Sequence, residues 1–211
     1  MNMENTDMIM NYFKAKFGHP MEYVGLMKSI AVGSLHIKDV FPLCILNIST
    51  SQTFKSVTSS ELLRMFPKDI VNFGSDFTIH SLMKNYNNGK DVMNKVCSIN
   101  DMVILLESKS GRGKDRLLGA FSESLTDGHY SYSDFSSNIE WNTGRYSLCS
   151  NITIEKYNTM QDELIQTTFD ERMLKFFYLM SQKGWNEFNS DRDNRFLMKP
   201  PKIKILQGIK P

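Results

Sequence analysis

Residues 47–59, NISTSQTFKSVTS, lie between an apolar run, PLCIL at 42–46, and a segment with the pattern of a helix, SELLRMF at 60–66. A strand, a loop and a helix in this order are the setting of a phosphate-binding loop, whose pattern is G-x-x-x-x-G-K-[ST]. Lys55 and Ser56 hold the last two positions of that pattern, whereas Ser49 and Phe54 stand where the two glycines would be. The position of the stretch and its Lys-Ser pair predict a phosphate loop, but the two glycines of such a loop are missing.

The composition is that of an ordinary globular protein. Of the 211 residues 41% are hydrophobic and 23% charged, with a formal net charge of +2, which indicates one domain with a substantial core. So small a net charge gives no electrostatic case for nucleic acid as the main ligand, although it allows a local basic patch. No apolar run reaches about 18 residues, and the N-terminus lacks the order of a signal peptide, so we expect a cytoplasmic protein without a membrane span.

The cysteines and histidines do not form metal-binding patterns. Cys44, Cys97 and Cys149 lie in or beside apolar, strand-like runs without the spacing of a metal site or a disulfide framework, so we expect buried free thiols. The four histidines have no carboxylate or cysteine at ligand spacing, which argues against a metal site or a histidine-based triad.

Predicted helices and strands alternate along the chain. Helical periodicity covers residues 4–17, 20–35, 58–66, 78–86, 115–125 and 155–164. Strand-like runs cover 42–48, 69–73, 94–107 and 145–153, with a hairpin or ordered loop at 126–144 and a Gly-rich loop at 108–115; periodicity leaves 172–180 unassigned. This order predicts a three-layer α/β domain with about five mainly parallel strands and the three cysteines on neighbouring central strands.

Four segments, residues 42–63, 96–135, 139–153 and 168–176, together resemble the core of AAA+ P-loop ATPases, particularly helicase-like members carried by phages and plasmids. The order and spacing of the motifs are similar over about residues 40 to 180. The resemblance implies N-terminal helices over 1–38, an AAA+-like core over 39–180 and a C-terminal extension over 181–211. The helical lid that follows the core in this family is expected to be absent or reduced.

The same resemblance implies a site for ATP and Mg²⁺. Ser51, Thr53, Lys55 and Ser56 would form the nucleotide loop, with Lys55 on the β- and γ-phosphates and Ser56 on the metal ion. Asp101 would hold the metal through water. The next residue is Met102, where the family often has the glutamate that activates water, and Glu107 would be a displaced substitute if residues 102–107 are the true strand.

Three further residues resemble family positions near the γ-phosphate. Asn151 and Thr153 resemble sensor residues that position the attacking water, and Arg172 resembles an arginine that reaches the γ-phosphate of its own or a neighbouring subunit. Structural roles explain the same residues: a solvated Lys55, a turn at Asp101, a strand cap at Asn151 and Thr153, and a surface pair between Glu171 and Arg172.

The Gly-rich stretch SKSGRGKD at 108–115 admits two interpretations besides a merely solvated loop. Residues 108–114 could themselves be a phosphate loop, although Asp115 would set a carboxylate beside the phosphate charge. Alternatively, Lys109, Arg112, Lys114 and Arg116 form a mobile basic loop that contacts nucleic acid or a neighbouring subunit.

Three functions remain open at this point. The first is a degenerate P-loop domain with weak or no ATP hydrolysis, acting as a binding or assembly module linked to DNA replication or a mobile element, through self-association or a related ATPase. The second is an active, ring-forming ATPase or helicase-like motor acting on DNA. The third is an α/β domain that shares only the fold.

Overall fold

The computed structural model describes residues 3–35, 37, 41–67, 71–74, 94–107, 111–133, 138–142 and 144–203. The elements of the described residues are, in chain order, α1 (Met3–Phe17), α2 (Met21–Ser34), β1 (Ile45–Ser49), α3 (Lys55–Met65), β2 (Val71–Gly74), β3 (Val96–Ile99), α5 (Met102–Glu107), α6 (Gly111–Asp127), β4 (His129–Ser133), β5 (Asn138–Asn142), β6 (Ser147–Thr153), α7 (Ile154–Gln166), a 3-10 turn (Asp170–Arg172), β7 (Leu174–Phe177), α8 (Gln182–Ser190) and α9 (Arg192–Leu197).

Five of the strands form one sheet in the order β2-β3-β6-β1-β7, and every neighbouring pair is parallel. The predicted α/β fold with a parallel sheet of about five strands is thereby confirmed. The run 172–180, which periodicity left unassigned, supplies the outer strand β7. The polar segment before β6 forms an antiparallel hairpin from β4 and β5, as one of its two interpretations predicted.

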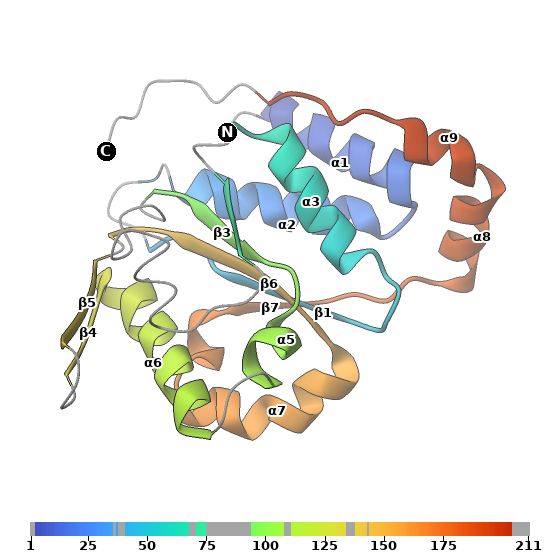
Figure 1. The fold of residues 1–211 in the computed structure, drawn as a ribbon. Coiled ribbons are helices and arrows are strands. Elements are labelled where there is room, and N and C mark those ends of the chain that lie inside the picture. Colours follow the sequence, from blue (N-terminus) through green and yellow to red (C-terminus); the bar gives the residue numbers. More distant parts are fainter. Residues whose placement is uncertain are drawn as a thin grey trace.

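Helices cover both faces of the sheet (Figure 1). Alternate residues of β1 point to opposite faces, so Leu46 and Ile48 join a core beneath α5, α6 and α7, whereas Ile45 joins a core beneath α1, α2 and α3. The three-layer arrangement follows from a sheet that is apolar on both faces, because each face needs its own layer of helices.

The prediction of three cysteines on neighbouring strands is confirmed for two of them. Cys97 on β3 and Cys149 on β6 occupy adjacent strands, and Cys44 directly precedes β1. All three are buried and free. Burial raises the pKa of the Cys97 thiol to about 12, so it stays protonated at neutral pH.

Two sequence assignments after β3 were wrong. Residues 102–107 form helix α5 and not a strand, because β3 ends at Ile99 and the Asp101 carboxylate accepts a hydrogen bond from the backbone N–H of Val103 at 2.9 Å. Aspartate at this position starts a helix. The second phosphate-loop register at 108–114 is excluded as well, since helix α5 stands where that loop needs a strand and α6 already begins at Gly111.

The remaining helices agree with the prediction apart from their ends. Helix α3 begins at Lys55, three residues before the predicted start. The helix expected at 78–86 lies outside the described residues. After Met180 the described chain forms the two short helices α8 and α9 and no bundle of three. None of the described helices has the length and apolarity to cross a membrane.

Candidate functional site at the carboxyl edge of the sheet

The ends of β1, β3 and β6 bring the predicted loop and two other connections to one edge of the sheet. Ser49, the last residue of β1, pairs with Thr153 at the end of β6. Thr153 caps α7 by accepting a hydrogen bond from the backbone N–H of Lys156 at 3.4 Å. Asp101 follows β3 at the same edge. Ligands of parallel α/β sheets bind at this carboxyl edge.

The loop adopts left-handed backbone angles without any glycine. Gln52 has φ 64° and Phe54 has φ 60°. Phe54 stands where a phosphate loop has its second glycine, and a bulky residue in this region costs about 1–3 kcal/mol. The chain thus keeps a backbone turn that glycine would form freely, and other contacts must hold it in place.

Aromatic packing supplies those contacts. The ring of Phe54 lies 5.3 Å from that of Phe17 on α1, and 5.4 and 4.6 Å from those of Trp185 and Phe188 on α8, between ring centroids. Each such pair contributes about 0.5–1.5 kcal/mol beyond the burial of its area, so three pairs suffice to offset the backbone cost. The loop is therefore anchored to both ends of the chain.

Lys55 folds back over its own loop. Its Nζ lies 3.3 and 3.2 Å from the carbonyl and hydroxyl oxygens of Ser49 and 3.4 Å from the Thr53 hydroxyl, and it also donates to the Thr50 carbonyl. Partial burial lowers the pKa of Lys55, and the nearby carboxylates of Asp101 and Glu155 oppose that shift. The ammonium thus contacts the loop oxygens and interacts electrostatically with two carboxylates.

The hydroxyl groups of the loop divide into an inner and an outer set. Thr53 is buried, shares a hydrogen bond with the Ser49 hydroxyl and donates to the Thr50 carbonyl at 2.8 Å. Tyr178, just after β7, donates to the Thr53 carbonyl at 3.2 Å. Ser51 and Ser56 are exposed, and α3 begins without a side-chain cap. The exposed first turn of α3 is the part of this edge that is open to an anion.

Asn151 is buried beneath α3 and does not reach the open edge of the sheet, where a sensor residue would contact the attacking water. It is buried, and its amide donates to the Ser59 hydroxyl at 3.2 Å and to the Asn100 carbonyl at 2.9 Å, while its oxygen accepts from Asn47 at 3.1 Å. Its polar atoms are thus committed to α3 and the neighbouring strands. Thr153, two residues later, is the residue of this pair that reaches the edge.

A buried lysine completes this polar layer. Lys28 of α2 is fully buried and donates to the Ser59 hydroxyl at 2.9 Å. Burial lowers its pKa to about 8. Among the described residues, the side-chain oxygens of Asn47, Ser98 and Asn100 are buried without a hydrogen-bond partner. The sequence did not predict this buried group of Lys28, Ser59 and Asn151, because a lysine in a helix is usually exposed.

Two carboxylates, Asp101 and Glu155, raise the pKa of Lys55 through their charge, and only Asp101 was predicted. Asp101 is at the expected place but also caps α5. Glu155, in the first turn of α7, was missed; the signal was its place two residues after the sensor-like Thr153. Glu107 does not join them, since it forms an exposed ion pair with Lys156. The described residues contain no group of three or more His, Cys, Asp or Glu side chains that could hold a metal, so Mg²⁺ at Ser56 and Asp101 stays a prediction.

Arg172 does not join the site. It precedes Leu174, which pairs with Ile45 at the start of β1, so it lies at the amino edge of the sheet. At about 3.3 Å per residue, Leu174 and Ile45 are about 13 Å from Ser49 along the strands, and Arg172 lies beyond them. Arg172 is exposed. From this edge it could contact a nucleotide only if that nucleotide were bound to another subunit.

The predicted basic loop is largely the start of a helix. Arg112, Lys114 and Arg116 belong to the first two turns of α6, and Lys109 lies outside the described residues. Lys114 forms an ion pair with Glu163 at 2.6 Å. The structure therefore replaces the mobile loop with a helix whose basic residues are spread around its first turns.

No protein-family model matches the chain, and no curated protein matches it at a significant level.

Proposed function

We propose that this protein is a degenerate P-loop domain that binds nucleotide weakly at the loop between β1 and α3, with slow or no hydrolysis of ATP, and acts as a binding or assembly module. The observation that carries the proposal is the position of Lys55: its ammonium lies over the loop at the carboxyl end of the inner strand β1, beside the exposed first turn of α3. An ammonium and a helix N-terminus together attract phosphate.

The residues at this edge fit the phosphates of a nucleotide better than they fit its metal ion. Lys55 and the N–H groups of the first turn of α3 would hold the phosphates, and the exposed Ser56 hydroxyl with Asp101 would hold Mg²⁺. Bound Mg²⁺ would neutralise charge on the phosphates. Of this chain's own residues, Glu155 is a carboxylate at the edge that could accept a proton from water.

Two features of the loop favour weak binding. The three N–H donors of Lys55 already lie within hydrogen-bond distance of four oxygen atoms of its own loop, so contact with a phosphate requires it to give up some of these hydrogen bonds. The side chains of Gln52 and Phe54 stand at left-handed positions where glycine would allow the closest approach of a ligand to the backbone.

Calorimetric titration with ATP and Mg²⁺ is expected to give a Kd no tighter than about 100 μM, or about −5.5 kcal/mol, and phosphate release well below about 10 per second. Lys55→Ala is expected to weaken binding at least tenfold. Lys183→Ala, at an exposed lysine of α8, is the matched control and should leave the Kd unchanged. Equal binding by Lys55→Ala and the native protein would refute the site.

A second candidate, an active ATPase that assembles into a ring, is favoured by the two carboxylates near Lys55. In that case binding is in the low micromolar range, and Asp101→Ala or Glu155→Gln abolishes phosphate release while binding persists. Arg172, exposed at the far edge, would then act only in a neighbouring subunit, so Arg172→Ala would reduce turnover in the assembled protein alone. Self-association or a related ATPase is the partner in both candidates, with DNA as the substrate of the motor.

A further inference from the structure

Phe54 connects the candidate loop to the C-terminal part of the chain. Its ring packs against Trp185 and Phe188 of α8, and Trp185 and Phe188 pack against each other with centroids 6.2 Å apart. Phe54 also starts α3, because its carbonyl accepts the first backbone hydrogen bond of the helix, from Thr58 at 2.8 Å. The residue immediately before Lys55 is thus held by a helix about 130 positions later in the sequence.

Helix α8 is itself fixed at its start. Ser181 caps it by accepting a hydrogen bond from the backbone N–H of Gly184 at 3.1 Å. A Cβ at Gly184 would lie 2.5 Å from the His19 carbonyl oxygen, so α8 approaches the turn between α1 and α2 at a distance that only glycine permits. This close approach sets where Trp185 and Phe188 meet the loop.

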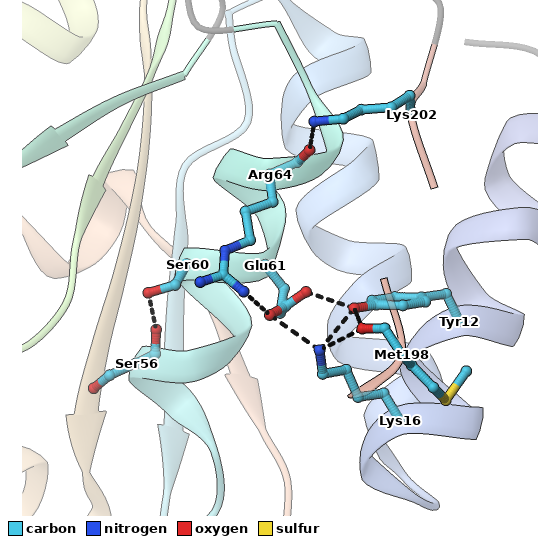
Figure 2. Close-up of polar contacts among 8 residues, drawn as sticks. All are labelled: Tyr12, Lys16, Ser56, Ser60, Glu61, Arg64, Met198 and Lys202. Atoms are coloured by element: carbon cyan, nitrogen blue, oxygen red, sulfur yellow. Dashed lines mark hydrogen bonds and ion pairs between the residues drawn. The ribbon is translucent and has the colours of Figure 1, made fainter. Parts of the chain in front are cut away.

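The chain after α9 is tied to the other end of α3 (Figure 2). The Met198 carbonyl accepts a hydrogen bond from Lys16 of α1 at 3.0 Å, and Lys202 donates to the Arg64 carbonyl at 2.8 Å. The backbone N–H of Ile203 donates to the Met65 carbonyl at 3.0 Å. The segment 181–203 therefore holds α3 at both ends, through Phe54 at its start and through Arg64 and Met65 at its close.

We propose that Phe54 is a positioning residue, through which α8 fixes the left-handed turn that places Lys55 over its loop. Glycine would adopt this left-handed turn without strain, whereas here the packing of α8 on Phe54 stabilises it. The conformation of the loop that binds phosphate therefore depends on the docking of α8. The proposal rests on the proposed function for its ligand, but its statement about the loop stands without any ligand.

Deuterium exchange of the backbone amides at the start of α3, first of all that of Thr58, whose N–H donates to the Phe54 carbonyl at 2.8 Å, measures the turn with no nucleotide present. Trp185→Ala, which removes one aromatic partner of Phe54, is expected to speed this exchange about fivefold, the size expected for the loss of one ring pair. Phe196→Ala is the matched control, because it removes a half-exposed ring from the neighbouring helix α9 that packs on Phe188. Equal exchange of these amides in the two variants would overturn the proposal.

Combining Trp185→Ala with a substitution of Phe54 distinguishes a positioning role of Phe54 from a general loss of stability. In Phe54→Gly the turn needs no aromatic support, so adding Trp185→Ala should change the exchange by less than twofold, whereas in the conservative variant Phe54→Tyr it should again change it about fivefold. An equal effect of Trp185→Ala in all three backgrounds would contradict the proposal and indicate a merely structural role.

Titration of the same variants with ATP and Mg²⁺ distinguishes this inference from the proposed function. If the loop binds nucleotide, Trp185→Ala weakens the Kd about fivefold in the native background and leaves it unchanged in Phe54→Gly. If no variant binds, the proposed function fails while the exchange experiment still decides whether Phe54 positions the loop.

Discussion

Replacing Glu61 with leucine is expected to lower the free energy of unfolding by about 3–5 kcal/mol, because it leaves the Lys16 ammonium buried without its counter-charge. The two groups lie 3.2 Å apart, and their side chains are only 3% and 5% exposed. Tyr12 donates to the other Glu61 oxygen at 2.5 Å, so α1 and α3 are joined through one carboxylate (Figure 2).

Chemical denaturation measures this loss, and the same carboxylate offers a matched control. Arg64 lies 3.1 Å from the Glu61 oxygen that Lys16 contacts, but its side chain is 64% exposed. Arg64→Gln is therefore expected to cost less than about 1 kcal/mol. The double variant Lys16→Met with Glu61→Leu should recover most of the loss, since no unpaired charge is then buried. A cost for Glu61→Leu no larger than that for Arg64→Gln would contradict this account.

Replacing Lys28 with methionine is expected to raise the free energy of unfolding at pH 7 by about 3 kcal/mol. Burial lowers the pKa of Lys28 from an ordinary 10.5 to about 8, and a change of one pKa unit corresponds to about 1.4 kcal/mol. Methionine has a similar length and brings no charge to be buried. Ser59 keeps two hydrogen bonds without Lys28, one accepted from Asn151 and one donated to the Lys55 carbonyl.

The effect of Lys28→Met has a defined dependence on pH. Below about pH 8 Lys28 is charged in both the folded and the unfolded protein, so the full cost of burying the charge is present. Between about pH 8 and 10.5 only the unfolded protein binds the proton, so the cost declines as the pH rises and the two proteins converge. The difference between them is the quantity to compare, because the buried thiol of Cys149 beside Lys28 ionises in the unfolded chain over the same range.

Stability curves from pH 6 to 10 test this expectation. Lys183→Met makes the same substitution at a side chain that is 87% exposed, and it should change the free energy of unfolding by less than about 0.5 kcal/mol at every pH. A destabilising Lys28→Met would show that the ammonium is better compensated than burial implies, and a stabilising effect still undiminished at pH 10 would contradict the lowered pKa.

The periodicity of the apolar residues predicted most of the helices and strands. The helices at α1 and α2, the strands β1 and β6 and the alternation that makes a parallel sheet all depend on which positions are apolar, and that pattern is read directly from the residues. The pattern gave the wrong element at residues 102–107, because a short run of apolar residues occurs both in buried helices and in buried strands. The Asp101 cap, a contact between neighbouring residues, settled that run as α5.

The sequence by itself placed Lys55 on a loop between a central strand and a helix, and Asp101 at the same edge, because the order of elements decides which strand ends meet. Only the tertiary structure decided the state of the site. The left-handed turn at Phe54 depends on rings contributed from α1 and α8, the burial of Asn151 depends on α3 lying over β6, and Glu155 approaches Lys55 from another connection. These contacts join residues about 35 to 135 positions apart, and local sequence preference carries no information about contacts of that kind.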